Sequence, residues 1–348
     1  MASLEQAAQT SPLFRHRQLA PAAAVRVSPL CLGAMTFGGR QESRYGDCTR
    51  EDAFSILDHF YSQGGNFIDT ASAYQEGQSE ILVGEWMASR NNRDQIVLAT
   101  KYTAAYMTHH KDAIQSNYGG NNAKSMKVSV EQSLLIYLGI SDTPAWVVTK
   151  ANQYARDHGL RPFAVYQGMW SAAMRDFERD IIPMAREEGM ALCPYGVLNQ
   201  GRFQTREGFE EREKHNPGRK FIPTSEHDKK VSAALEDIST AKGVKLLDVA
   251  LAYVMQKSVY VFPIIGCRKI DHIKGSIASL NVILTDEEME KVDAAYPFDF
   301  GFPHTFLSGS MLDHSTPRMA EKPGDVWLTK AMGKFDWVEQ TKPIRPAS

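Results

Sequence analysis

The sequence predicts an α/β fold in which a sheet of parallel strands is covered by helices. Short apolar runs alternate with amphipathic helical segments from Val25 onward, and these runs are continuous, as in strands buried on both faces. Two architectures fit this alternation, a doubly wound sheet and a (β/α)8 barrel. No G-x-G-x-x-G follows the first run, which weakens the doubly wound alternative.

Seven apolar runs are expected to form strands, at residues 25–33, 66–69, 95–101, 136–141, 163–167, 190–195 and 259–266. Helices are expected at 79–90, 144–158, 175–188, 225–242, 246–256 and 270–280, with a further helix that starts after residue 49. A closed (β/α)8 barrel has eight strand–helix units, so the sequence is one unit short.

Capping residues mark the ends of two of these helices. Thr49 is a good N-cap with Asp52 three residues later, close to a capping box, and Gly64 can supply the left-handed residue at the C-terminal end. Pro144 and Gly159 frame another helix at its first position and just past its end.

One junction lacks a turn. In SVEQSLLIYLGIS, residues 129–141, a helical pattern runs into a strand pattern with no Gly, Asn or Pro between them. The alternative is a helix that ends early, with a tight turn at Leu134 and Leu135. The missing strand–helix unit is therefore expected at this junction.

The composition excludes several classes of protein. The 348 residues include 39 Lys and Arg against 41 Asp and Glu, which argues against non-specific binding to nucleic acid or to an anionic membrane. Cys31, Cys48, Cys193 and Cys267 are far apart, so a reduced, cytoplasmic protein without disulfides or a zinc site is expected. No apolar run reaches the roughly 20 residues of a membrane helix, and no secretory signal is visible.

The two ends of the chain differ in composition from its middle. Residues 1–24 are rich in Ala, Gln and Pro and are interpreted as a loose leader, and residues 25–296 as a single barrel domain. Residues 297–348 contain six of the sixteen prolines and are expected to be a C-terminal loop and tail. Four phenylalanines between residues 298 and 306 suggest that its first part docks on the body.

Three polar residues are expected to converge at the carboxyl ends of neighbouring strands, where barrels place their functional groups. Asp69 ends the second strand, Tyr74 follows in the next loop and Lys101 ends the third strand. An ammonium lowers the pKa of a nearby phenol and a buried carboxylate orients the ammonium, so Tyr74 could protonate a carbonyl oxygen while a hydride arrives at carbon. The alternative is an ordinary ion pair with Tyr74 at the rim.

A basic turn follows the last strand. Gly266 ends the strand, Arg268 and Lys269 follow, and a helix starts close after them, an arrangement that suits the 2′-phosphate of NADP. A solvated basic turn is the alternative. Tyr195 and Gln167 also end strands and could stack on a cofactor ring and bond a carboxamide. No H-E-x-x-H pattern is present, and no metal site is expected.

These residues, with LGAMTFGG near the start and GCRKIDHIKGSI near the end, resemble the aldo-keto reductase superfamily. GGNFIDTASAYQ, GEWMASR, NRDQIVLATKY, YLGISDTPAWVV, VYQGMWS, FERDIIPMA and FPHTF match, in order, its branch of fungal aryl-alcohol dehydrogenases and norsolorinic acid reductases. The resemblance implies a (β/α)8 TIM barrel that binds NADPH without a Rossmann domain. It also implies reduction of a small aldehyde or ketone, aromatic or polyketide-derived, to the alcohol in secondary metabolism.

The resemblance assigns roles residue by residue. Tyr74 is implied as the general acid, Lys101 as its pKa partner and Asp69 as the orienting carboxylate. The implied cofactor positions are Met35, Asp69, Ser141, Asp142, Gln167, Tyr195, Gly196, Gly201, Gly266, Arg268, Lys269, His272 and Ser276. Of these, Ser141, Asp142 and Gln167 match positions facing the nicotinamide amide, Tyr195 the stacking aromatic, and Gly266, Arg268 and His272 the adenosine-phosphate loop. Ser276 stands where many members have Asn.

The sequence departs from the family at the junction without a turn. Family members have a fourth strand ending in His-Trp and a fourth helix between the equivalents of Leu134 and Ile136, about 40 residues that this chain lacks. The catalytic His lies in that segment. A catalytically impaired NADP-binding or partner-binding protein is therefore the alternative function, and the protein is expected to be a monomer or a weak homo-oligomer.

Overall fold

The computed structural model describes residues 10–102, 112, 114–118, 123–130, 137–215 and 223–346. The chain divides into two compact units, whereas one barrel domain is expected over residues 25–296. The first unit comprises Met1–Gly168, Glu188–Tyr195 and Tyr260–Asn281, and the second comprises Met169–Glu187, Gly196–Val259 and Val282–Ser348.

The first unit contains the strands of the predicted parallel sheet. In its described residues these are β3 (Cys31–Gly33), β4 (Phe67–Asp69), β5 (Val97–Ala99), β6 (Gly139–Ser141), β7 (Val165–Met169, whose last residue is assigned to the second unit), β8 (Ala191–Tyr195) and β9 (Ile264–Gly266). Four of them form one sheet in the order β5-β4-β3-β9, and three form another in the order β6-β7-β8. A parallel bridge between Leu192 and Val261 joins the two sheets.

The strand order is open between β5 and β6. No pairing between these two strands is found in the described part of the chain, which is the order expected if the fourth strand of an eight-stranded barrel is absent. Burial follows the same pattern, because β3 and β4 are buried throughout, β5 is half-buried, and two of the three residues of β6 are exposed. The seven strands match the seven apolar runs of the sequence.

The register of the strands aligns their carboxyl ends. Gly33 pairs with Asp69 on one side and with Gly266 on the other, and Asp69 pairs with Ala99. Ser141 pairs with Gln167 in the second sheet. Polar residues that end these strands, or directly follow them, therefore lie at one rim.

An antiparallel hairpin precedes the parallel strands and corrects the interpretation of residues 1–24 as a loose leader. β1 (Arg17–Ala20) pairs with β2 (Ala23–Val27), and its apolar residues join one buried cluster with Phe67, Ala164 and Phe262. The strand expected over residues 25–33 is thus two strands, separated by Ser28–Leu30, where Pro29 has no amide to donate.

The helices of the first unit are α2 (Glu42–Tyr45), α3 (Arg50–Ser62), α4 (Gln78–Arg90), α5 (Ala123–Val130), α6 (Ala145–Asp157) and α11 (Ile270–Ala278). The capping box predicted at Thr49 and Asp52 is confirmed. Pro144 and Gly159 bracket α6 as predicted, although Pro144 is its N-cap and not its first helical residue.

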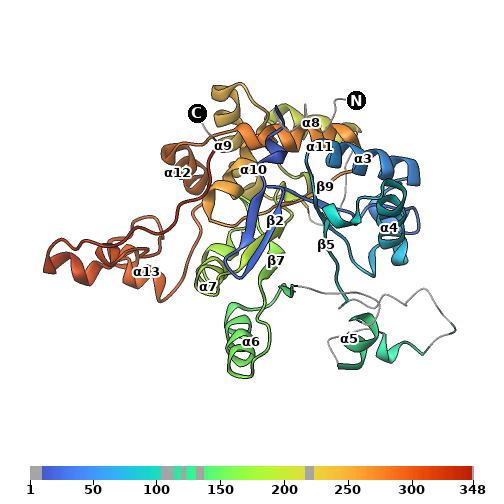
Figure 1. The fold of residues 1–348 in the computed structure, drawn as a ribbon. Coiled ribbons are helices and arrows are strands. Elements are labelled where there is room, and N and C mark those ends of the chain that lie inside the picture. Colours follow the sequence, from blue (N-terminus) through green and yellow to red (C-terminus); the bar gives the residue numbers. More distant parts are fainter. Residues whose placement is uncertain are drawn as a thin grey trace. The chain divides into compact units, whose positions relative to one another are not determined.

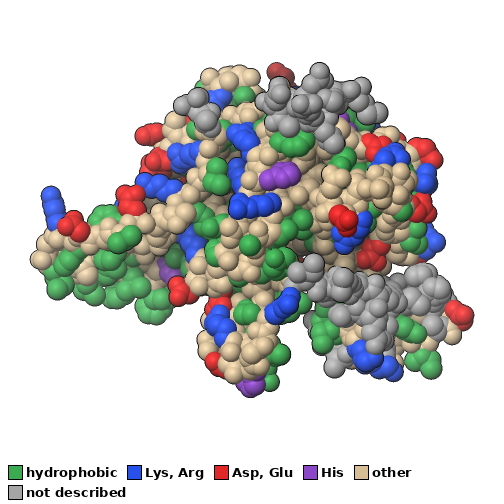
Figure 2. Space-filling view, in the orientation of Figure 1, with side chains coloured by type: hydrophobic (Ala, Val, Ile, Leu, Met, Phe, Trp, Pro, Cys, Tyr) green, Lys and Arg blue, Asp and Glu red, His purple; other side chains and the backbone are tan. Residues whose placement is uncertain are grey.

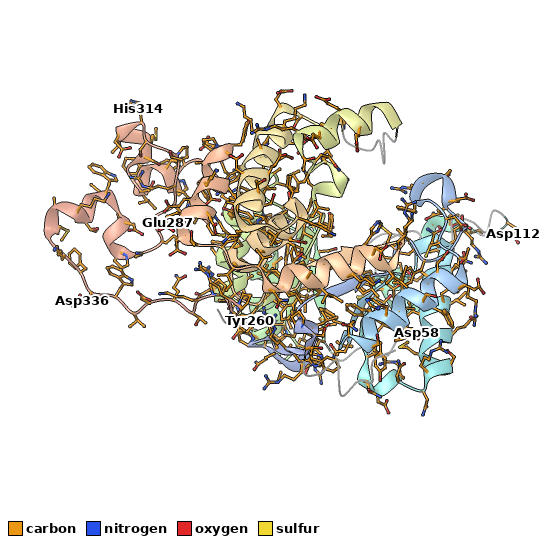
Figure 3. All side chains as sticks on the ribbon, turned by 90° about the horizontal axis from the view of Figure 1, so that it is seen from above. Asp58, Asp112, Tyr260, Glu287, His314 and Asp336 are labelled. Carbon is orange, nitrogen blue, oxygen red and sulfur yellow. The ribbon has the colours of Figure 1, made fainter. Side chains whose placement is uncertain are left out.

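Two helices of the first unit, α3 and α4, lie side by side (Figure 1). The Asp58 carboxylate on α3 accepts hydrogen bonds from Trp86 Nε1 at 2.8 Å and from Arg90 Nη2 at 2.7 Å, both on α4. Asp58 is labelled in Figure 3. These contacts hold the two helices that flank β4, the strand that ends in Asp69.

The second unit is helical in its described residues. It contains α7 (Ile181–Glu187), α8 (Arg206–His215), α9 (Glu226–Lys242), α10 (Leu246–Lys257), α12 (Asp286–Ala295), α13 (His304–Leu307) and α14 (Ser310–Asp313). The helix expected over residues 175–188 is broken into a short 3-10 turn and α7. In a continuous helix the ring of Pro183 would clash with the carbonyl group of Arg179, four residues earlier. None of the described helices is long and apolar enough to cross a membrane.

The first part of the C-terminal segment docks within the second unit. The guanidinium of Arg179 lies 4.8 Å from the ring centroid of Phe298, and Arg179 donates to the carbonyl oxygens of Asp299 and Phe300. Beyond this point the segment carries exposed apolar side chains, including Met311, Met332 and Val338. Hydrophobic side chains gather on the left of Figure 2. The expectation of a docked first part is therefore met.

The open strand order predicts unequal protection of backbone amides. In an edge strand every other amide has no partner strand, so amides in residues 97–99 and 139–141 should exchange faster than those in 31–33 and 67–69. Hydrogen exchange followed by mass spectrometry of peptides covering these strands measures the difference. Equal, slow exchange in all four strands would contradict an open order.

Candidate active site

A buried ion pair forms the centre of the candidate site. Asp69 at the end of β4 is 3% exposed, and Lys101 follows β5. The ammonium of Lys101 donates to both carboxylate oxygens of Asp69, at 2.8 and 2.6 Å, and to the carbonyl of Thr70 at 2.8 Å. All three ammonium hydrogens thus have an acceptor, which fixes the direction of the lysine side chain.

Tyr74 lies beside this pair. It begins a short helical turn, Tyr74–Gly77, and the Lys101 ammonium is 4.8 Å from the centroid of its ring. The three residues that the strand positions were predicted to bring together are therefore neighbours. The arrangement places a phenol, an ammonium and a carboxylate in one half-buried cluster.

The pKa values in this cluster reflect burial as well as charge. Burial raises the pKa of Tyr74 above its usual value, and the Lys101 ammonium opposes this shift without reversing it. The expectation of a net lowered phenol pKa is not met in this structure. Burial lowers the pKa of Lys101, but Asp69 and Tyr74 outweigh it and the net pKa is raised. Lys101 is therefore a cation at neutral pH.

Gln167 joins the site from β7. Its side-chain amide donates to Asp69 Oδ1 at 3.0 Å, and its backbone carbonyl accepts from the amide of Asp142 at 3.0 Å. Ser141 is its partner in β6. Three of the residues assigned to the nicotinamide amide are thus adjacent in space, with Ser141 and Asp142 exposed at the edge strand.

Tyr195 at the end of β8 is tied to the same rim. Its hydroxyl donates to Asp142 Oδ1 at 2.9 Å, and Asp142 has a left-handed backbone with φ of 49°. Burial raises the pKa of Tyr195, and the Asp142 carboxylate adds to this effect. The ring of Tyr195 is therefore neutral and held at its hydroxyl end.

Sequence patterns did not single out Gln75, which anchors the turn that carries Tyr74. Its side chain is fully buried, accepts from the amide of Gln41 at 2.7 Å and donates to the carbonyl of Met35 at 3.4 Å. Gln75 and Glu76 both have positive φ, at 51° and 55°. Such strained backbone persists only where the surroundings enforce it. Gln75 is a polar residue directly after Tyr74 and belongs to no helical or strand periodicity, so no pattern in the sequence could have identified it.

The predicted basic turn lies between β9 and α11. Gly266, Arg268, Lys269 and His272 are exposed, and Lys269 is the N-cap of α11. Ser276 is buried and donates to the carbonyl of His272 at 3.1 Å. Burial lowers the pKa of His272, and the charges of Arg268 and Lys269 lower it further, which marks a locally positive surface.

Two predicted cofactor residues belong to the second unit. Gly196 and Gly201 have φ of 70° and 82°, and the intervening Asn199 and Gln200 also have positive φ. Glycine tolerates these angles, whereas Asn199 and Gln200 are strained.

The described residues fit a phosphorylated nicotinamide cofactor. No carboxylate in the described part of the chain pairs with Arg268, so its guanidinium donors are available to an anion. A Cβ at Gly266 would meet nothing within 4 Å, so the approach to the turn is open. No group of His, Cys, Asp and Glu among the described residues could hold a metal ion.

The fold and the site define the class of protein. The Aldo/keto reductase family model matches residues 29–136 and 121–297, and the chain belongs to this family. Membership implies a (β/α)8 barrel, and the seven-strand order of the first unit is one strand short of it. The family match divides in two at residues 121–136, close to the junction without a turn.

Individual relatives are similar over nearly the whole chain. A norsolorinic acid reductase B of Dothistroma septosporum is 58% identical, with 99% of this chain and 97% of the relative covered. An aryl-alcohol dehydrogenase GME11368 of Pestalotiopsis microspora is 44% identical, with 97% and 94% covered. An aryl-alcohol dehydrogenase [NADP(+)] of Phanerodontia chrysosporium is 40% identical, with 96% of each chain covered. Together they support an oxidoreductase of fungal secondary metabolism.

The length of the first alignment agrees with an absent strand–helix unit. It extends over 380 positions, whereas this chain has 348 residues, so at least 32 positions are occupied only in the relative. One strand–helix unit of a barrel is of that size, about 30 residues. The relative therefore has enough additional positions for the unit that the sequence leads us to expect.

Burial of Tyr74 predicts that its phenol titrates late. Its phenol should ionise above the usual value of 10.0, so the proton-donating form persists past that pH. In Lys101→Met the pKa should rise further, because the charge that favours the phenolate is gone. Carbon-13 NMR of tyrosine labelled at Cζ, assigned with Tyr74→Phe, reports the titration. Ionisation of Tyr74 well below 10.0 would contradict a pKa raised by burial.

Proposed function

We propose that this protein is an NADPH-dependent reductase that converts an aldehyde or ketone, aromatic or polyketide-derived, into the alcohol. The observation that carries the proposal is the buried Asp69–Lys101 ion pair beside the ring of Tyr74. A hydrogen-bonded ion pair at the rim of the strands, beside the phenol of Tyr74, suits proton transfer to an oxygen.

Each residue of the trio has a separate task in this proposal. Tyr74 donates its phenolic proton to the carbonyl oxygen of the substrate. Lys101 stabilises the phenolate left behind, because its charge favours the deprotonated form. Asp69 keeps Lys101 charged and pointed at the tyrosine. The bound cofactor supplies the hydride to the carbonyl carbon, so two electrons and one proton complete the reduction.

The cofactor is proposed to bind along the rim. Arg268 and Lys269 would hold the 2′-phosphate, with Gly266 leaving room for it and His272 beside it. Gln167, Ser141 and Asp142 would bond the nicotinamide amide. The ring of Tyr195 would stack on the nicotinamide, since its hydroxyl bond to Asp142 keeps it from turning.

The substrate class is proposed from the relatives. Their names refer to norsolorinic acid and to aryl alcohols, so an aromatic carbonyl compound of secondary metabolism is the first class to test. A panel of aromatic aldehydes and aryl ketones, followed by NADPH oxidation at 340 nm, tests it.

A second candidate function is cofactor binding without turnover. It is favoured by the open strand order, because the family's catalytic His lies in the segment that this chain lacks. The two candidates differ in one measurement. Cofactor binding with no turnover over the whole panel supports the second, and turnover by the 348-residue chain excludes it.

Tyr74→Phe should lower kcat for carbonyl reduction by about 10² to 10⁴, because the only proton donor of the proposed mechanism is removed. NADPH binding should stay within twofold. Tyr61→Phe is the matched control, since it removes an exposed hydroxyl bonded to Gln95. Steady-state kinetics and cofactor titration of the three proteins measure this, and full activity in Tyr74→Phe would exclude Tyr74 as the acid.

The unmodified chain should bind NADPH more tightly than NADH. Arg268→Ala should weaken NADPH binding about ten- to a hundredfold, the value of one or two hydrogen bonds to a charged group, and leave NADH unchanged. Lys274→Ala removes an exposed cation from α11, the helix that follows Arg268, and is the control. Quenching of tryptophan fluorescence gives the dissociation constants. Equal affinity of the unmodified chain for both cofactors would remove the phosphate assignment.

A further inference from the structure

We propose that the loop after β3, residues 34–49, determines cofactor preference by seating Arg268, with Gly46 and Thr36 as the positioning residues. The inference rests on the proposed function, since it concerns how the same phosphate site is built. Thr36 lies in the LGAMTFGG motif, but no sequence pattern assigned a role to either residue.

Arg268 lies directly against the backbone of Gly46. A Cβ built on Gly46 would be 2.0 Å from Nη1 of Arg268 and 3.1 Å from its Cζ. The first distance is far below a van der Waals contact and the second is shorter than an ordinary one, so any side chain at Gly46 would displace the guanidinium. The contact involves the charged end of the arginine, which is the part that would bind a phosphate.

Gly46 also has a backbone that only glycine adopts readily. It follows α2 with φ of 75° and ψ of 167°, and its amide donates to the carbonyl of Glu42 at 2.7 Å. This conformation turns the chain so that an unsubstituted Cα faces Arg268. The space for the guanidinium is therefore built by the loop itself.

A second contact holds the base of the same turn. The buried hydroxyl of Thr36 donates to the carbonyl of Cys267, the residue before Arg268, at 2.9 Å. The loop is closed on itself by the amide of Gly38, which donates to the carbonyl of Cys48 at 3.0 Å. Thr36 thus holds the backbone at the residue before Arg268, and Gly46 leaves the space that the guanidinium of Arg268 occupies.

The loop is held in place from its other side by the turn of the proposed catalytic tyrosine. Gln41 and Gly39 donate their amides to the side chains of Gln75 and Gln78, and Arg40 donates to the carbonyl of Glu76. The loop is therefore a fixed support and not a free surface segment, and a fixed support can set the geometry of a bidentate arginine.

The test compares dissociation constants of NADPH and NADH for G46A, R268A and the double variant G46A/R268A. G46A should weaken NADPH binding about tenfold or more, as loss of a well-placed charged hydrogen bond does. The dissociation constant of NADH should stay within twofold. Because the effect passes through Arg268, the double variant should bind NADPH no more weakly than R268A alone. The readout is quenching of tryptophan fluorescence, which does not depend on turnover.

G333A is the matched control for backbone strain. Gly333 has φ of 120° and ψ of -161°, also a region open mainly to glycine, but a Cβ there would meet nothing within 4 Å. It should leave both dissociation constants unchanged. A selective loss in G46A but not in G333A then reports the contact with Arg268.

T36V keeps the proposal testable if G46A does not fold. Valine has the shape of threonine without the hydroxyl, so the bond to Cys267 is lost and NADPH should again bind more weakly while NADH does not. Equal weakening of both cofactors in G46A and T36V, or additive losses in G46A/R268A, would overturn the inference. If the unmodified chain prefers NADPH and R268A abolishes this preference, the proposed function stands even when G46A and T36V have no selective effect.

Discussion

An ammonium group in a low-dielectric rim is costly unless its hydrogens all find acceptors, and the geometry around Lys101 follows from that requirement. Asp69 supplies two oxygens and Thr70 a carbonyl, so the lysine has one orientation. Gln167 in turn satisfies the Asp69 carboxylate from β7. Tyr74 lies beside this fixed ammonium. The charge of Lys101 favours the phenolate form of Tyr74, whereas burial favours the neutral phenol. The site therefore balances two opposing effects on one proton.

Much of this arrangement could be predicted from local patterns. Strand ends were visible as apolar runs that stop at Asp69, Lys101 and Gln167, and parallel register then requires their proximity. The capping box at Thr49 depends on two residues three apart, so it could be predicted without any tertiary information. The missing unit between Leu134 and Ile136 could be predicted as well, because a helical pattern runs into a strand pattern there with no residues left for a turn.

The remainder depends on contacts between segments far apart in the chain. The hairpin β1–β2 lies in a stretch rich in Ala and Pro, and only its burial against Phe67 and Phe262 makes it part of the core. The bond of Gln75 to Gln41 and the contact of Gly46 with Arg268 have no periodic signal. The net direction of the Tyr74 pKa was missed for the same reason, since burial is a property of the folded rim.

The open edge beside β5 raises the question of how Lys101, which follows that strand, keeps its place. The pairing of β5 with β4 is sufficient to hold Lys101 in place. The amide of Thr70 donates to the carbonyl of Ala99 at 2.9 Å, and Ser72 donates both its amide and its hydroxyl to the carbonyl of Lys101, at 3.2 and 2.9 Å. Backbone and side chain of Lys101 are thus both anchored to the segment that begins with Asp69. The absent unit removes a neighbour of β5, whereas the bonds that orient Lys101 all come from the β4 side and remain.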